Sequence, residues 1–383
     1  MRKLIVMIMM FAVAITANAQ SDFDVAQSFM QKKGITLQDN PKTSINRAAS
    51  NKPYSIYNGE EGKGFAIVVN GSIVGYSTEN SVDINDICPT LEVILKEYAA
   101  MPNNRAESTS DLPSWFEPRN VTPIEPLLKT EWHQGTPYNN ILNQTGICVV
   151  VSLAQMLHYF KSQMECEVVD SVYDYDEFKY VPSGIVLPNI TFNHDLILDK
   201  YEPNKYTEEQ GEEVAKLYNY AYYSGKSGYK FNNTWGYESY TLQIWEFDDR
   251  YILIDPCLDR KIPVQSFSWN HAYVVDGRDS QGLYHINLGW GGGGNGYYAV
   301  PRDQSRKGLN HDGSGASHAE DMGCFKYLAP RNWDEIVAKI DSKKQNKAHT
   351  SHFYNLNGQY VGETLKGLPR GIYVSNGKKY IVK

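Results

Sequence analysis

The sequence lacks the cysteine patterns that define metal-binding and disulfide-built proteins. Its 383 residues include only five cysteines, and no two of them form a CxxC or CxxH pair. Structural zinc sites need closely spaced ligands, and small disulfide-stabilised domains need far more cysteine for their length, so neither class is indicated. An odd number in an exported protein leaves at least one cysteine that is buried, bonded to another chain or used in chemistry. The five are Cys88, Cys148, Cys166, Cys257 and Cys324.

Positive charge is also scarce. The chain has 37 Lys and Arg residues against 44 Asp and Glu, which gives a formal net charge of -7. Nucleic acids and anionic membranes bind basic surfaces, so we expect no nucleic-acid partner. The sequence contains neither a His-Glu-x-x-His motif nor paired Asp-Thr-Gly motifs, which would indicate zinc or aspartic peptidases. We expect no metal ion or other cofactor.

Long apolar runs are missing except at the N-terminus. There Arg2 and Lys3 precede an apolar run over residues 4–15, followed by Ala-Asn-Ala at 17–19. A charged start, a short apolar core and a small-x-small site are typical of a signal peptide, and the run is too short to span a membrane. A buried N-terminal helix is the weaker alternative. We expect residues 1–19 to be a signal peptide, the product to be secreted or held at the cell surface, and no integral membrane segment.

After the signal peptide, the patterns predict a small α+β module. Residues 22–33 and 90–100 have helical spacing of apolar residues, and segments 64–70 and 72–76 flank an Asn-Gly turn typical of a β-hairpin. Residues 102–118 are polar and lack periodicity, which predicts a protease-accessible linker.

The main domain shows a helix in its first half and strands near its end. Residues 148–161 are predicted to be helical, and three short apolar segments separated by glycine-rich turns are predicted to be antiparallel strands. A Lys-rich tail follows, for which strand, turn, strand is the simplest interpretation. The strand segments are residues 272–276, 283–287 and 296–300.

Cys148 is the cysteine whose neighbours suggest a chemical role. It follows Thr-Gly-Ile at the predicted start of the 148–161 helix, where free backbone N–H groups favour a thiolate. Thr145 is the expected N-cap. Taken alone, the helix favours the alternative that Cys148 is a small buried hydrophobe, which is the commoner fate of a single cysteine. A buried stripe is expected at Leu153, Met156, Leu157 and Phe160.

His271 supplies the second half of the site. A thiol nucleophile needs an imidazole on a neighbouring strand and a third group that orients the imidazole. His271 opens a predicted strand, and Asn287 and Trp290 follow it in a glycine-rich segment. Either could orient His271, Asn287 by a hydrogen bond and Trp290 by stacking its indole on the ring.

Three motifs in this order resemble the streptopain and interpain family of cysteine peptidases, which are papain-like. They are Thr-Gly-x-Cys with Ala-Gln-Met around Cys148, Asn-His-Ala-Tyr-Val-Val-Asp-Gly at 270–277 and His-Ile-Asn-Leu-Gly-Trp-Gly-Gly at 285–292. Residues 125–138 are similar to the start of that family's mature domain, and residues 54–68 to its inhibitory propeptide. The tail more weakly resembles C-terminal segments of secreted Bacteroidetes proteins.

The resemblance implies an α+β fold, with Cys148 as nucleophile, His271 as base and Trp290 as the residue that shields or orients His271. The backbone N–H of Cys148 would donate to the oxyanion. A glutamine upstream of the histidine would complete the hole, and Gln243 is the best match, with Gln144 as the alternative if the geometry is closer to papain.

The same resemblance divides the chain into a signal peptide (1–19), an inhibitory propeptide with its linker (20–118), a papain-like catalytic domain (119–330) and a C-terminal tail (331–383). It implies a zymogen whose partners are protein or peptide substrates and its own propeptide, which acts as an intramolecular inhibitor.

Several departures from the family pattern keep other functions open. Ile147 and Asn270 stand where the family has glycine before its cysteine and histidine, Leu288 stands where it often has tryptophan, and Val149 to Val151 replace smaller residues. The stretch 220–269 looks shortened, with residues 226–230 as the remnant of a substrate-binding loop. One alternative is a degenerate paralogue that binds peptides or proteins without cleaving them; another is a structural protein at the cell surface.

Overall fold

The computed structural model of the 383-residue chain describes most of the molecule outside its termini and several connecting segments. Residues 1–20, with the expected signal peptide, lie outside the described part. In the described residues, no helix is long and apolar enough to cross a membrane. The described ranges are 21–39, 42–43, 54–101, 111–161, 167–174, 179–187, 191–226, 237–243, 251–268, 271–300, 324–335, 337–338, 353–355, 359–362, 364–375 and 378–382.

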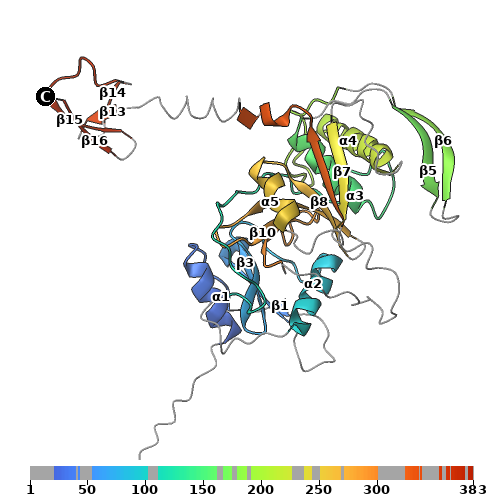
Figure 1. Cartoon of the computed structure of the whole chain (residues 1–383), viewed down its shortest axis with the longest axis horizontal. Coiled ribbons are helices and arrows are strands. Elements are labelled where there is room, and N and C mark those ends of the chain that lie inside the picture. Colours follow the sequence, from blue (N-terminus) through green and yellow to red (C-terminus); the bar gives the residue numbers. More distant parts are fainter. Residues whose placement is uncertain are drawn as a thin grey trace, which may run out of the picture.

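A ten-stranded sheet forms the centre of the molecule (Figure 1), and all its described strand pairs are antiparallel. Its strands come from both the N-terminal module and the main domain. In their order across the sheet they are β1 (Lys42–Thr43), β2 (Ser55–Asn58), β3 (Phe65–Val69), β4 (Ser72–Ser77), β11 (Gly296–Tyr298), β10 (Tyr284–Asn287), β9 (His271–Arg278), β8 (Val264–Ser268), β12 (Cys324–Pro330) and β7 (Tyr237–Gln243).

The N-terminal module has the predicted helices and hairpin. Helix α1 (Asp22–Gln31) begins with a capping box between Ser21 and Asp24, and α2 (Pro89–Ala100) begins with proline at its first position. The β3–β4 turn places Asn70 and Gly71 at φ 49° and 75°. Two consecutive residues of positive φ give the turn whose twist matches a hairpin, and Asn-Gly is the pair that adopts it most readily.

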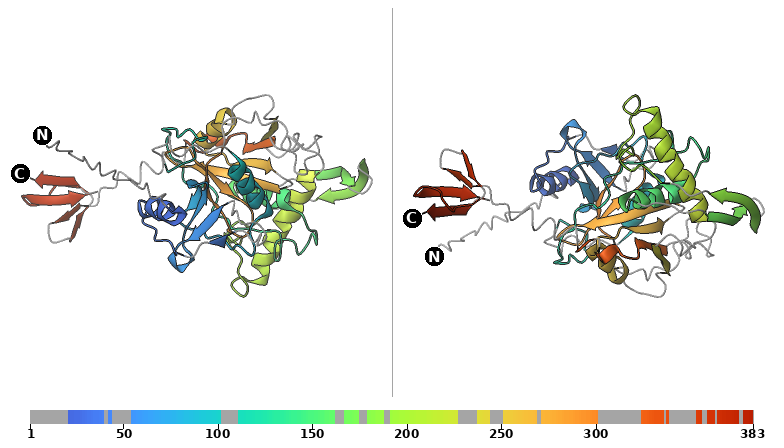
Figure 2. Two further views of the ribbon diagram at one scale, coloured as in Figure 1. Left: turned by 90° about the horizontal axis from the view of Figure 1, so that it is seen from below. Right: turned by 90° about the horizontal axis from the view of Figure 1, so that it is seen from above.

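The N-terminal module joins the main domain by strand pairing. Tyr76 and Gly75 of β4 pair with Tyr297 and Tyr298 of β11, and the Tyr76 and Tyr297 rings stack with centroids 5.1 Å apart. A Cβ at Gly75 would lie 2.7 Å from the Tyr298 ring, so a larger residue would separate the strands. Figure 2 shows this module, in blue, against the orange strands in both views. The two parts therefore share one sheet.

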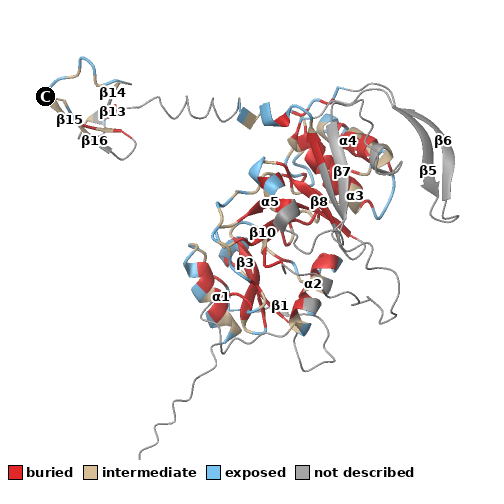
Figure 3. Cartoon of the chain, in the orientation of Figure 1, coloured by how far each residue is buried: buried red, intermediate tan, exposed pale blue. Residues whose placement is uncertain are grey.

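The helical part of the main domain packs on this sheet. Helix α3 (Cys148–Tyr159) contacts β9 and also α4 (Glu208–Lys226), while α5 (Tyr251–Asp259) lies against β8 and β9. Figure 3 shows buried residues continuing from β3 through β10 to β8. The predicted stripe of α3, Leu153, Met156, Leu157 and Phe160, is buried as expected.

Two smaller sheets complete the described structure. Strands β5 (Glu167–Asp174) and β6 (Lys179–Leu187) form a hairpin of their own. The tail forms a four-stranded sheet in the order β14-β13-β15-β16, which extends the simple strand-turn-strand prediction. Its strands are β13 (Phe353–Asn355), β14 (Tyr360–Gly362), β15 (Gly371–Ser375) and β16 (Lys378–Val382).

The expectation that all of residues 102–118 form an open linker is wrong for the part that is described. Leu112 and Phe116 are buried in a core cluster with Val25 and Phe29 of α1. The backbone carbonyl of Asp111 also accepts a hydrogen bond from the N–H of Ile73 over 2.7 Å. Residues 111–116 therefore pack with the N-terminal module.

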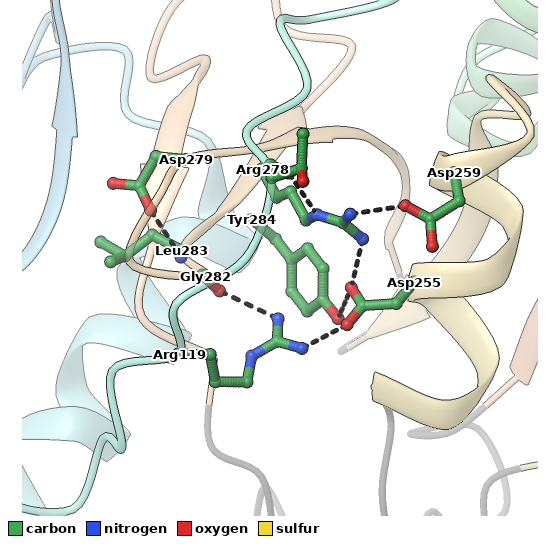
Figure 4. Close-up of polar contacts among 9 residues, drawn as sticks. Arg119, Asp255, Asp259, Arg278, Asp279, Gly282, Leu283 and Tyr284 are labelled. Atoms are coloured by element: carbon green, nitrogen blue, oxygen red, sulfur yellow. Dashed lines mark hydrogen bonds and ion pairs between the residues drawn. The ribbon is translucent and has the colours of Figure 1, made fainter.

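The segment that follows is fixed to the main domain by charged side chains (Figure 4). Arg119 pairs with Asp255 of α5, which also accepts from the Tyr284 hydroxyl over 2.8 Å and lies 3.1 Å from the Arg278 guanidinium. Arg278 in turn bonds Asp259 over 2.5 Å. This network holds the beginning of the main domain against its sheet.

Candidate active site

Cys148 is the first residue of α3. The turn before it is supported by a glutamine side chain that stands 13 residues before Ile147. The side-chain Oε1 of Gln134 accepts a hydrogen bond from the N–H of Ile147 over 2.8 Å. The N-cap position is Ile147 rather than Thr145, which is exposed, so the N-cap expectation for Thr145 is wrong. Because Gln134 ties down the chain just before the helix, no threonine cap is needed there.

Ile147 does not obstruct the backbone at this point. Its φ is -97°, and the positive φ of the turn, 66°, falls on Gly146 instead. A β-branched residue adopts negative φ without strain. The Ile147 side chain is 1% exposed and belongs to the main core cluster. This departure from the family pattern is therefore accommodated by the core.

The thiol of Cys148 lies beside the start of strand β9. The backbone N–H of Ala272, the residue after His271, points at the thiol, as do the N–H groups of Val149 and of Cys148 itself. Burial raises the pKa of the Cys148 thiol, and these three N–H groups act in the opposite direction. Packing of α3 on β9 thus brings the predicted nucleophile and the predicted base to the same place.

His271 is held by a backbone carbonyl. Its Nε2 lies 2.7 Å from the oxygen of Leu288. A carbonyl oxygen can only accept, so Nε2 carries the hydrogen and Nδ1 keeps its lone pair. Burial lowers the pKa of His271, and the bond to Leu288 partly opposes this. The ring is therefore neutral in this covered state, with Nδ1 as the atom that can take a proton.

Asn287 supports the loop that carries this carbonyl and does not bond to the imidazole itself. Its Nδ2 donates to the carbonyl of Thr130 over 2.7 Å, and its Oδ1 accepts from the N–H of Gly289 over 3.0 Å. Gln155 of α3 also reaches Oδ1, at 3.4 Å. Asn287 thus acts on His271 indirectly, through the carbonyl of Leu288, and not by the direct hydrogen bond that was expected.

The rings of Trp290 and His271 meet edge to face rather than face to face. The two ring centroids are 6.1 Å apart and the planes meet at 74°, so the stacking expected for Trp290 is replaced by an edge-to-face contact with His271. Its indole N–H donates to the backbone carbonyl of Asp86 over 3.0 Å. Trp290 therefore touches both the imidazole and the N-terminal module.

The N-terminal module lies along the site from Asn80 to α2. The Asn80 amide donates to Glu131 over 2.8 Å, and the carbonyl of Ser81 accepts from the N–H of Gly294 over 3.1 Å. A Cβ at Gly294 would lie 3.0 Å from Leu91 of α2, which shows how closely the helix approaches the loop. Together with the bond from Trp290, these contacts place residues 80–91 over the catalytic groups.

Neither of the two glutamines expected from the sequence has a described bond to the turn before Cys148, and the role of Gln243 stays a prediction. Gln144 is exposed. Gln243 ends β7, three strands from β9 in the sheet, and its side chain lies outside the described part. Sequence analysis missed Gln134, although it stands in the Trp-His-Gln-Gly stretch that resembles the start of the family's mature domain. Asn270 and residues 227–230 also lie outside the described residues.

A metal centre is not formed by the described side chains. Among them, no group of three or more His, Cys, Asp and Glu residues could hold an ion.

Comparison with known proteins identifies both parts of the chain. Residues 132–298 match the peptidase C10 family, and residues 14–101 match the Spi protease inhibitor family. Comparison with curated protein sequences gives no match.

Two solved structures from Prevotella intermedia are similar. A prointerpain A fragment, a mutant with cysteine replaced by alanine, is 19% identical with a TM-score of 0.53, covering 76% of this chain and 98% of that chain. Active wild-type interpain A cysteine protease is 22% identical with a TM-score of 0.38, covering 54% and 94%. At such identities the first likeness shows the fold alone.

The fold and the family matches define a papain-like cysteine peptidase preceded by an inhibitory domain. Residues 132–298 form a peptidase C10 domain, the domain of the streptopain family, and residues 14–101 form a Spi-type propeptide inhibitor domain on the same polypeptide.

Proposed function

We propose that the chain is an exported endopeptidase made as a zymogen, in which Cys148 is the nucleophile and His271 is its general base. The observation that carries this proposal is the contact of the Cys148 thiol with the backbone N–H that follows His271. Residues 1–19 direct export, residues 20–118 form the propeptide and its linker, residues 119–330 catalyse, and residues 331–383 form the tail.

The reaction uses groups of this chain only. Nδ1 of His271 takes the proton of Cys148, and the thiolate attacks the carbonyl carbon of the scissile peptide bond. The imidazolium then protonates the leaving amine, and water, deprotonated by the same imidazole, hydrolyses the acyl-enzyme. The bond from Nε2 to Leu288 favours the imidazolium, because a carbonyl oxygen stabilises the charged ring. No metal or cofactor is required.

The oxyanion receives two donors. One is the backbone N–H of Cys148 at the start of α3. The second is the amide of Gln134: its Oε1 accepts from the N–H of Ile147, the residue before Cys148, and its NH₂ group is the donor. Gln134 replaces Gln243 and Gln144 in this role, because it is the glutamine with a described bond to the turn before the nucleophile.

Latency follows from the same geometry. Residues 80–91 cover the catalytic groups. The pairing of β4 with β11 also makes the propeptide part of the same sheet as the catalytic domain. Cutting the linker within residues 102–118 is the first step of activation, and separation of β4 from β11 is the second.

A peptidase assay on cut protein tests the proposal. Limited trypsin treatment should cut the linker, since Arg105 is the only basic residue in residues 102–110. Hydrolysis of unfolded casein under reducing conditions is then compared for wild type, Cys148→Ala and the matched control Cys257→Ala, whose cysteine is buried in α5. We expect activity in wild type and control and none in Cys148→Ala. Equal hydrolysis by all three would contradict the assignment.

A further inference from the structure

Glu131 is a carboxylate of the catalytic domain that the mechanism above does not use. Its Oε1 accepts a hydrogen bond from the side-chain amide of Asn80, a residue of the propeptide, over 2.8 Å. Its Oε2 lies 2.6 Å from Nζ of Lys200, which also belongs to the catalytic domain. One oxygen of the carboxylate is therefore bonded within the enzyme, and the other is bonded to a residue that leaves with the propeptide.

The catalytic domain holds this carboxylate beside the glycine-rich loop. The backbone N–H of Glu131 donates to the carbonyl of Asp199 over 2.7 Å, and the carbonyl of the next residue, Trp132, accepts from the loop at Gly291 over 3.0 Å. A Cβ at Gly292 would lie 2.8 Å from Oε2 of Glu131, so the loop and the side chain are in close contact. These contacts do not involve the propeptide, and we expect them to persist after it separates.

The loop lies on the leaving-group side of the scissile bond. In the proposed mechanism the imidazolium of His271 protonates the leaving amine, so the substrate residues that follow the scissile bond pass on the side of the imidazole. Trp290 contacts the His271 ring and donates its indole N–H to the carbonyl of Asp86. The N–H of Gly294 donates to the carbonyl of Ser81. The propeptide segment that begins at Asn80 thus occupies the place of the departing part of a substrate.

We propose that Glu131 is a specificity-determining residue, which selects substrates that carry an N–H-donating side chain on the leaving-group side. The inference rests on the proposed function, because it assumes that the chain cleaves peptides and that His271 protonates the leaving amine. An asparagine of the substrate would bond Oε1 as Asn80 does in the zymogen. An aspartate has the same shape, but it offers no donor and brings a second negative charge against Glu131.

Lys200 provides a test of opposite sign. Its ammonium group attracts carboxylates, so by itself it would favour aspartate in the substrate. The Lys200 side chain is 49% exposed, and an exposed ion pair contributes little to folding stability. Substitution of Lys200 should therefore leave the protein folded and strengthen the rejection of aspartate, whereas substitution of Glu131 should remove that rejection.

The experiment measures kcat/KM for pairs of quenched fluorescent peptides that differ only in asparagine or aspartate, placed in turn at each position after the scissile bond. The proteins are trypsin-cut wild type, Glu131→Gln, Lys200→Gln and the control Glu212→Gln, whose glutamate is exposed on α4. Trypsin is inhibited before the assay, and mass spectrometry of the products verifies the bond that is cut.

At one position we expect wild type and Glu212→Gln to prefer asparagine by about tenfold, the effect of one hydrogen bond to a charged group. The preference should be larger in Lys200→Gln. In Glu131→Gln it should fall to about twofold or less, because a glutamine amide accepts from asparagine and donates to aspartate.

Equal cleavage of both peptides of every pair by wild type, or an undiminished preference in Glu131→Gln, would overturn the inference and leave the peptidase assignment intact. Loss of the preference in Lys200→Gln would also overturn it, because the account requires the preference to grow. If wild type cuts none of the peptides, the proposed function fails, and this inference fails with it.

Discussion

The imidazole of His271 is oriented by the backbone carbonyl of Leu288, which accepts a hydrogen bond from Nε2 over 2.7 Å. Substitution of Leu288 would change its side chain but would leave this backbone carbonyl in place. Its position depends on the side chains that hold the loop, above all Asn287, which bonds Thr130 and Gly289. The orientation of the base is thus controlled from a neighbouring residue.

Replacement of Asn287 by alanine should therefore impair catalysis through His271. We expect kcat to fall by about 100-fold, the size of effect that a small misplacement of a catalytic group produces. Loss of the carbonyl contact would also lower the pKa of His271, so the acidic limb of the kcat/KM profile, where the general base becomes protonated, should move to lower pH. The exposed Asn140→Ala serves as control. A fall in activity without any movement of the acidic limb would contradict a positioning role.

Substitution of three glutamines separates the candidates for the oxyanion donor. Gln134→Ala should lower kcat by about 100- to 1000-fold with a smaller effect on KM, as removal of one such donor does elsewhere. Gln144→Ala should retain activity, because Gln144 is exposed. Gln243→Ala should also retain it. A large kcat defect in Gln243→Ala, with normal activity in Gln134→Ala, would restore the sequence-based assignment.

The alkylation rate of Cys148 should depend on whether the propeptide covers it. Burial raises the thiol pKa in the covered enzyme, so at neutral pH little thiolate is present and iodoacetamide reacts slowly. The rate should rise about tenfold per pH unit below that pKa, since thiolate is the reacting form. Removal of the propeptide admits water, lowers the pKa and should speed the reaction near pH 6. Intact mass with peptide mapping measures both profiles; superimposable profiles would contradict this account of latency.

The network around Asp255 should matter more for stability than its neighbour Asp259. The Asp255 side chain is 20% exposed and interacts with Arg119, Arg278 and Tyr284. That of Asp259 is 60% exposed and, among the described residues, pairs with Arg278. Asp255→Ala should lower the free energy of unfolding by about 2–3 kcal/mol, because it leaves largely buried charged and polar groups without their partner. Asp259→Ala should cost less than about 1 kcal/mol. Urea unfolding of the full chain measures both, and equal losses would show that burial does not set the difference.

Local features of this fold could be predicted from sequence because neighbouring residues determine them. The Asn70-Gly71 turn, the start of α3 at Cys148 and the strand that opens with His271 were all expected, and the structure has them. Each depends on a short pattern of turn residues or apolar spacing.

Features that depend on contacts between distant segments were missed. The pairing of Tyr76 with Tyr297 joins residues far apart in the chain, and no periodic pattern encodes which edge strands meet. Gln134 was overlooked because its role lies in its bond to Ile147, and that same bond makes a cap from Thr145 unnecessary. The segment 111–116 is too short to show periodicity, yet Leu112 and Phe116 are buried.

The most direct test of the account is the intact mass over time of the purified zymogen, wild type beside Cys148→Ala and Cys257→Ala, in reducing buffer at mildly acid to neutral pH. We predict that wild type and Cys257→Ala lose the mass of the propeptide and linker, whereas Cys148→Ala stays at full length. Shortening of Cys148→Ala at the wild-type rate would contradict the central claim that Cys148 is the nucleophile of a self-processing peptidase.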